Sequence, residues 1–167
     1  LFLAESAYLK NEYTSALEIL EKVREQGYAF FQLKGQVYFD TRQYADAKPF
    51  FEKAAAAAPA PDQRNNSLFD LAQALFNLKS YDEAASVAAK IENPAKTVKT
   101  NLDEFYAKTF MAAGKFKEAA EKYADVSKLK RDSTDKTAAL YFSALAFQRG
   151  DMNEDAKQQL ERLFAMN

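Results

Sequence analysis

The sequence contains no cysteine and no histidine among its 167 residues. Enzymes that activate a serine, cysteine or threonine nucleophile with an imidazole base are therefore excluded. Zinc sites built from cysteine and histidine, and thiol redox chemistry, are excluded on the same ground. The chain also has only four glycines, which cannot easily supply a glycine-rich phosphate loop. We therefore expect a protein that is not an enzyme and that uses no cofactor and no metal.

The chain has little excess of either charge, with 23 Lys and Arg against 24 Asp and Glu. Its most basic stretch, residues 90–136, interleaves lysines with acidic residues, whereas a nucleic-acid surface carries a large basic excess on one face. No apolar run approaches the roughly 20 residues of a transmembrane helix. We expect neither a nucleic-acid partner nor a membrane span.

The composition leaves the cellular compartment open. A chain without cysteine suits the cytoplasm and the periplasm equally well. Its many Lys, Ala and acidic residues resemble the composition of bacterial proteins. The bacterial cytoplasm and the periplasm or cell envelope therefore stay as alternatives.

Helix is the regular structure that the sequence pattern supports. Glycine and proline are scarce, and apolar residues recur at three- and four-residue steps, as in Leu68, Leu71 and Leu75. Ser80 and Glu83 have the spacing of a capping box, in which each side chain bonds a backbone amide at a helix start. We predict an all-α chain whose helices, about 10–15 residues long, pair through short turns.

Pairs of small residues twelve positions apart recur along the chain. An aromatic residue precedes the second small residue by three positions in four of the five pairs. This pattern indicates two helices that touch where both carry small side chains, with large side chains filling the space around the contact. The five pairs are Ala4/Ala16, Gly35/Ala47, Ala72/Ala84, Ala107/Ala119 and Ala144/Ala156.

The clearest of these repeats resembles the tetratricopeptide repeat (TPR) family. It reads Phe31, Lys34, Gly35 and Tyr38, followed by Tyr44, Ala47, Phe51, Ala54 and Pro59. The resemblance implies a right-handed α-α superhelix, or solenoid, of about five antiparallel helix pairs. The repeats of this single array would span roughly residues 1–27, 28–61, 65–94, 100–131 and 134–167.

Two residues of this repeat depart from the family pattern. Lys34 occupies a position where the family prefers an apolar residue. Pro49 lies early in the second helix of its pair, which is tolerable only if that helix begins at about Asp46–Lys48. We therefore expect this helix to start late.

The resemblance also implies a binding groove, because the first helices of such pairs line the concave side of the solenoid. Aromatic and amide side chains fill the exposed rows there, and an extended peptide can pair its backbone with amides and pack its side chains on rings. Phe39 and Phe76 have an alternative interpretation as core residues between repeats. The family's clamp for a C-terminal carboxylate is not reproduced, because Lys108 is the only cation in the rows that correspond to it. The residues expected in the groove are Tyr8, Gln32, Gln36, Phe39, Phe69, Gln73, Phe76, Asn77, Lys108, Met111 and Tyr141.

Both ends of the sequence are apolar, with Leu1, Phe2 and Leu3 at the start and Leu163 and Phe164 near the finish. Arrays of this kind are normally closed by polar capping repeats. We therefore expect either a fragment of a longer chain or ends that associate with another copy. The predicted function is a non-enzymatic scaffold that binds a protein, as a peptide or a partner helix, in the groove. The alternative is a structural segment of a larger solenoid or homo-oligomer that assembles through its end repeats.

Overall fold

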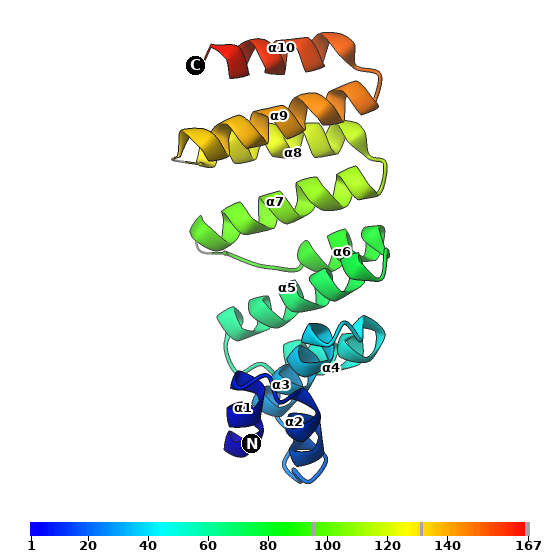
Figure 1. Cartoon of the computed structure of the whole chain (residues 1–167), viewed down its shortest axis with the longest axis vertical. Helices are drawn as coiled ribbons and strands as arrows, with labels where there is room; N and C mark the ends of the chain where they lie inside the picture. The colour runs from blue at the N-terminus through cyan, green and yellow to red at the C-terminus, as the bar shows by residue number, and fades with distance from the viewer. Residues whose placement is uncertain (95, 131, 166–167) are drawn as a thin grey trace. The chain divides into compact units, whose positions relative to one another are not determined.

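The computed structural model describes residues 1–94, 96–130 and 132–165, and these residues form ten α-helices and no β-strand. The prediction of an all-α chain is confirmed. The chain divides into two compact units, an N-terminal unit of Leu1–Asn93 and a C-terminal unit of Pro94–Asn167 (Figure 1). The N-terminal unit holds α1 (Phe2–Leu9), α2 (Tyr13–Leu20), α3 (Tyr28–Asp40), α4 (Tyr44–Ala57), α5 (Pro61–Asn77) and α6 (Tyr81–Ala88). The C-terminal unit holds α7 (Lys96–Ala112), α8 (Phe116–Leu129), α9 (Ser133–Arg149) and α10 (Asn153–Phe164). The expected repeat ends at residues 131 and 167 lie outside the described residues.

Each odd-numbered helix packs against the even-numbered helix that follows it, across a turn of three residues. The amide of the third turn residue donates to the carbonyl five residues earlier, as from Glu12 to Ala7 and from Ser80 to Leu75. This bond satisfies a carbonyl that the first helix leaves unpaired. The middle residue of each turn has a positive φ, the left-handed conformation that glycine adopts most easily. These residues are Asn11 (61°), Arg42 (60°), Lys79 (62°), Gly114 (75°) and Asp151 (59°).

All ten small residues of the repeat pattern are buried, as a close contact between the paired helices requires. Gly35 shows how close the contact is. A Cβ atom at this position would lie 2.8 Å from two ring carbons of Phe51 on α4, so the ring occupies the space that a side chain would need. The prediction of a close helix contact at a small residue is confirmed for Gly35.

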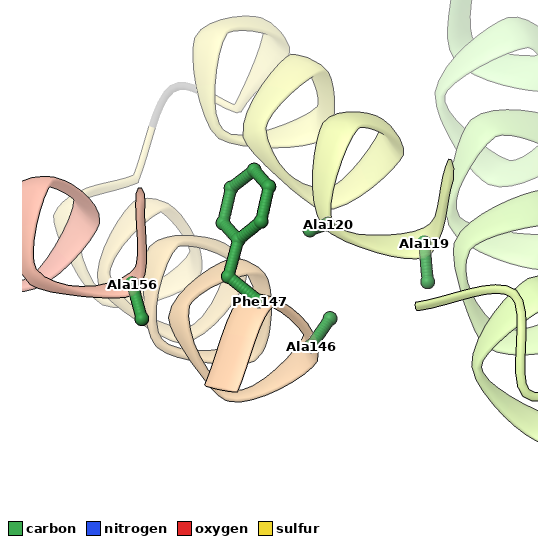
Figure 2. Close-up of a cluster of buried hydrophobic side chains, with 5 residues drawn as sticks. All are labelled: Ala119, Ala120, Ala146, Phe147 and Ala156. Atoms are coloured by element: carbon green, nitrogen blue, oxygen red, sulfur yellow. The ribbon is translucent and has the colours of Figure 1, made fainter. Parts of the chain in front are cut away.

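The core of the C-terminal unit follows the same rule of one large ring among small side chains. Phe147 projects from α9 toward α8 and forms one buried cluster with Ala119, Ala120 and Ala146 (Figure 2). Ala156 of α10 belongs to the same cluster. Helices α8, α9 and α10 are therefore held together by one shared apolar cluster.

The expectation of a capping box at the start of α6 is wrong. Ser80 is the N-terminal cap residue of α6, but its side chain makes no capping hydrogen bond. Its backbone amide already donates to the Leu75 carbonyl in the preceding turn, so Glu83 has no amide to reach back to. Glu83 instead pairs with Lys48 Nζ of α4 at 2.7 Å.

The expected late start of α4 is also wrong. The helix begins at Tyr44 rather than at Asp46–Lys48, so Pro49 lies inside it. The amide of Ala47 already donates to the carbonyl of Gln43, the last residue of the preceding turn. The turn therefore fixes the start of the helix, and Pro49 removes one backbone hydrogen bond from the second turn of the helix instead of delaying it.

Candidate protein-interaction surface

Helices α1, α3 and α5 of the N-terminal unit are joined by hydrogen bonds between polar side chains. Tyr8 Oη of α1 donates to Asp40 Oδ2 of α3 at 2.7 Å. Gln32 Nε2 of α3 donates to Asp70 Oδ2 of α5 at 2.5 Å, and Ser67 Oγ of α5 donates to Gln32 Oε1 at 2.6 Å. We call these five residues, together with the cleft described next, the first-helix surface.

A cleft of about 280 Å³ lies between α1 and α3. Three residues expected in the groove, Tyr8, Gln32 and Gln36, line it together. In the described part of the chain the Gln36 side-chain amide forms no hydrogen bond, so its donor and its acceptor can both serve a ligand. The rest of the lining is Leu1, Glu5, Tyr28, Ala29 and Leu33.

Two carboxylates give the first-helix surface a negative character. Burial raises the pKa of Asp70 to about 6; the hydrogen bond from Gln32 acts against this rise and the charge of Asp40 adds to it. Burial, and then the hydrogen bond to Asp40, also raises the pKa of Tyr8. The site therefore holds a carboxylate, that of Asp70, whose ionisation is opposed by its surroundings.

The groove prediction missed both carboxylates. Their hydrogen-bond partners come from other helices, 32 residues away for Asp40 and 38 for Asp70. One signal was available, because Asp40 lies four residues after Gln36 and Asp70 lies three residues before Gln73. Residues at these spacings share one face of a helix.

The two phenylalanines with an alternative core interpretation pack within their own helix pairs. The Phe39 ring centroid lies 5.3 Å from that of Tyr44 and 6.2 Å from that of Phe51. The Phe76 ring centroid lies 5.4 Å from that of Tyr81. Both side chains are half-buried, and these ring contacts lie within one helix pair rather than between adjacent repeats.

The other predicted residues of α5 differ in exposure. Phe69 and Gln73 are half-buried, and Asn77 is exposed. Asn77 Nδ2 donates to the backbone oxygen of Gln73 at 2.8 Å, a bond within the helix. The cleft that Gln36 lines does not include these three residues.

The predicted residues of the C-terminal unit lie in three different surroundings. Lys108 is exposed and lines a cleft of about 190 Å³ with Glu104 and Lys130, which form an ion pair. Tyr141 is 51% exposed and lines a separate cleft of about 330 Å³ between α9 and α10. Met111 packs against the core cluster of Figure 2. Lys108 and Tyr141 thus line separate clefts, and Met111 lines neither of these two.

The described residues offer neither a metal cluster nor a transmembrane helix. No group of three or more acidic side chains in residues 1–94, 96–130 and 132–165 is arranged to hold a metal ion. None of the helices in this part of the chain combines the length and the apolar character that crossing a bilayer requires.

Comparison with known proteins identifies the fold. Residues 33–96 match the model of the tetratricopeptide repeat family. No curated protein sequence matches the chain. Solved TPR structures match nearly all of it at low sequence identity. In each of the following, 98% of this chain is covered.

Three of these structures illustrate the TM-scores and sequence identities of the matches. A Podosopora anserina protein with nearly identical TPR-like repeats, described as a kinesin light chain, superposes with a TM-score of 0.73 at 19% identity over 91% of its length. YrrB, a TPR protein with an unusual peptide-binding site, gives a TM-score of 0.77 at 18% identity over 82% of its length. MamA gives 0.79 at 15% identity over 87% of its length.

The TPR fold is in general a scaffold for protein–protein interaction, and its solenoid of helix pairs is the fold class predicted from the sequence. Residues 33–96 thus match the tetratricopeptide repeat family by sequence, and the chain has the fold of TPR structures over nearly its whole length.

Proposed function

We propose that the N-terminal unit binds an extended peptide segment of a partner protein on its first-helix surface. The observation that carries the proposal is the cleft between α1 and α3, where the unpaired amide of Gln36 stands beside Tyr8 and Gln32. An amide that can both donate and accept is suited to the backbone of an extended peptide, and the apolar lining is suited to its side chains. The peptide-binding site of the similar structure YrrB adds support.

A random peptide library displayed on phage, with peptides about twelve residues long, supplies a probe whatever the sequence of the natural partner. Gln36→Ala is expected to weaken the affinity of selected peptides by about tenfold, because a buried backbone group of the peptide loses its hydrogen bond. Fluorescence anisotropy measures the affinity, and circular dichroism checks that helicity and melting temperature are unchanged. Gln158→Ala, an exposed glutamine of α10 in the C-terminal unit, is the matched control and should bind like the parent.

Equal peptide affinity for Gln36→Ala and the parent protein would rule out the cleft as the binding site. A second variant, Gln73→Ala with Phe76→Ala, tests whether the surface extends along α5. Loss of peptide binding without loss of melting temperature assigns these two residues to the groove. A lower melting temperature with normal binding assigns them to the core.

A second candidate function is assembly through an uncovered helix face, which the exposure of α1 favours. Leu3 directly precedes the small residue of its repeat and is 68% exposed, whereas its counterparts Leu71 and Ser143 are 5% and 0% exposed. Phe2 and Leu9 of the same helix are 79% and 74% exposed. Apolar area of this kind marks an association surface.

Sedimentation velocity over a range of protein concentrations tests this second candidate. We expect association that grows with concentration and that Leu3→Glu abolishes, because a charge cannot be buried in an apolar interface without a partner. A sedimentation coefficient that does not change with concentration would count against assembly.

A further inference from the structure

We propose that the peptide bound on the first-helix surface presents an arginine or lysine side chain to Asp40 and Asp70. This inference rests on the proposed function and names the chemistry of its ligand. The occupant is therefore a basic segment of a partner protein, with a cation positioned beside residues that can pack on the cleft.

Asp40 and Asp70 are each held by a hydrogen bond from a neutral side chain. Asp40 accepts a hydrogen bond from Tyr8 at Oδ2, and Asp70 accepts one from Gln32 at Oδ2. In the described part of the chain, Oδ1 of each aspartate accepts no hydrogen bond. Both carboxylates are thus held in place by a neutral donor while an acceptor oxygen remains available.

Within residues 1–94, 96–130 and 132–165, neither aspartate forms an ion pair with Lys or Arg. Asp103, the buried acid of the C-terminal unit, is by contrast paired with Lys122 at 3.1 Å. A carboxylate that is partly withdrawn from water is normally paired, so the lack of a partner at Asp70 is a cost that an incoming cation removes.

The two aspartates adjoin the cleft between α1 and α3. Tyr8 and Gln32 hold the aspartates and also line the cleft, so the charged and the apolar parts of the surface are adjacent. Leu33 and Tyr28 of the same cleft offer apolar contact to the residues that flank the cation. Arginine is favoured over lysine, because its planar head carries five donors and can bond to more than one carboxylate oxygen.

The charges near Asp70 favour the binding of a cation. The pKa of Asp70 is raised to about 6, and the charge of Asp40 contributes to the rise. Gln32 and Asp40 of α3 act on this carboxylate directly, and hydrogen bonds link these two residues to Ser67 of α5 and Tyr8 of α1. All of them are neutral or acidic, so a bound cation meets attraction and no competing positive charge among these groups.

The experiment uses peptides selected from the random phage library described above. We expect the selected sequences to share an arginine or lysine at one position. The probe is then a fluorescein-labelled peptide with arginine at that position and its citrulline analogue, which has nearly the same shape without the charge. On the parent protein we expect citrulline to weaken binding at least about tenfold.

The variant Asp40→Asn with Asp70→Asn keeps the acceptors for Tyr8 and Gln32 but removes both charges. On this variant we expect the arginine and citrulline peptides to bind within about twofold of each other. The control is Glu18→Gln with Glu52→Gln, which removes the same charge from exposed positions on α2 and α4. It should discriminate against citrulline as the parent does.

The outcomes separate the inference from the function on which it rests. Peptides that bind in a Gln36-dependent way but tolerate citrulline would overturn the inference and leave the peptide-binding function standing. Equal loss of discrimination in the control variant would also overturn the inference, because general attraction to an acidic protein would then explain it. Failure of every selected peptide to depend on Gln36 would overturn the proposed function, and the inference with it.

Discussion

Lys34 Nζ lies 2.5 Å from Glu21 Oε1, so the buried cation of α3 is paired with a carboxylate just after α2. Lys34 is 8% exposed, whereas the Glu21 side chain is 67% exposed. The ammonium group also lies 5.1 Å and 5.7 Å from the ring centroids of Phe50 and Phe30. The aliphatic stem of Lys34 therefore fills the place of an apolar residue, while its charged head reaches a solvated partner between two rings.

This arrangement predicts that the stem of Lys34 matters more than its charge. Lys34→Met keeps the stem and leaves the exposed Glu21 in water, so we expect the free energy of unfolding to change by less than about 1 kcal/mol. Lys34→Ala loses the stem as well and is expected to destabilise by about 2 kcal/mol. Urea denaturation compares the two. A methionine variant as unstable as the alanine variant would show that the ion pair holds the position.

The close approach of Phe51 to Gly35 predicts a strong interaction between these positions. Gly35→Ala gains helix propensity but drives its Cβ into the ring, and we expect a net loss of about 1–2 kcal/mol. Phe51→Leu in the same chain shortens the obstructing side chain. The double variant should therefore be at least about 1 kcal/mol more stable than the sum of the single effects predicts. Additive effects in urea denaturation would mean that the ring moves aside without strain.

Two helix starts predict responses of different size to the loss of a polar side chain. Asp132 caps α9, because its Oδ1 accepts from the amides of Thr134 at 2.8 Å and Asp135 at 3.3 Å. Asp132→Ala is expected to lower the free energy of unfolding by about 1 kcal/mol. Ser80→Ala should change it by only a few tenths, because the Ser80 hydroxyl makes no capping bond. Thermal denaturation of both variants tests the pair, and a larger loss at Ser80 would contradict the assignment.

The raised pKa of Asp70 predicts a stability that falls as the pH rises. Its pKa is about 6 in the folded chain against an ordinary value of 3.8, so the folded state holds the proton more tightly than the unfolded state. Stability from this group is complete below about pH 4 and is lost as the pH passes through 6. The full loss is of the order of 2–3 kcal/mol. Asp70→Asn removes the effect while keeping an acceptor for Gln32.

Urea denaturation at about pH 4 and about pH 7.5 checks this prediction. The difference between Asp70→Asn and the parent cancels most contributions from the other acids. We expect the two proteins to be nearly equal at the lower pH and the variant to be more stable at the higher pH. An unchanged difference between the two pH values would show that Asp70 ionises like an exposed aspartate.

The repeats could be predicted from the sequence because their rule is local. Ala47 and Phe51 lie one helical turn apart, and a small residue followed by a large one at this spacing describes a close helix contact wherever it occurs. The prediction of a capping box at the start of α6 failed because its outcome is not decided locally. Whether Glu83 can complete a capping box depends on where the Ser80 amide donates, and that is decided by Leu75 in the preceding helix.

The candidate site was predictable only in part. Tyr8, Gln32 and Gln36 follow from the register of the first helices, because residues at matching positions of successive repeats lie on one surface. The pairing of Tyr8 with Asp40 depends on how α1 packs against α3. Residue spacing along the chain does not predict this packing. Phe39 and Phe76 were ambiguous because half of a ring can belong to the core while the rest is exposed.

Because the turns within helix pairs are uniform, each pair is a structural unit that can be exchanged as a whole. The turns within pairs are always three residues long, whereas residues 21–27 join α2 to α3 and only residues 58–60 join α4 to α5. A turn whose third amide must meet a carbonyl five residues back loses that bond if one residue is added or deleted. Insertions and deletions should therefore accumulate in the connections between pairs. A whole pair can be exchanged or duplicated there without disturbing the register of any helix contact within a pair.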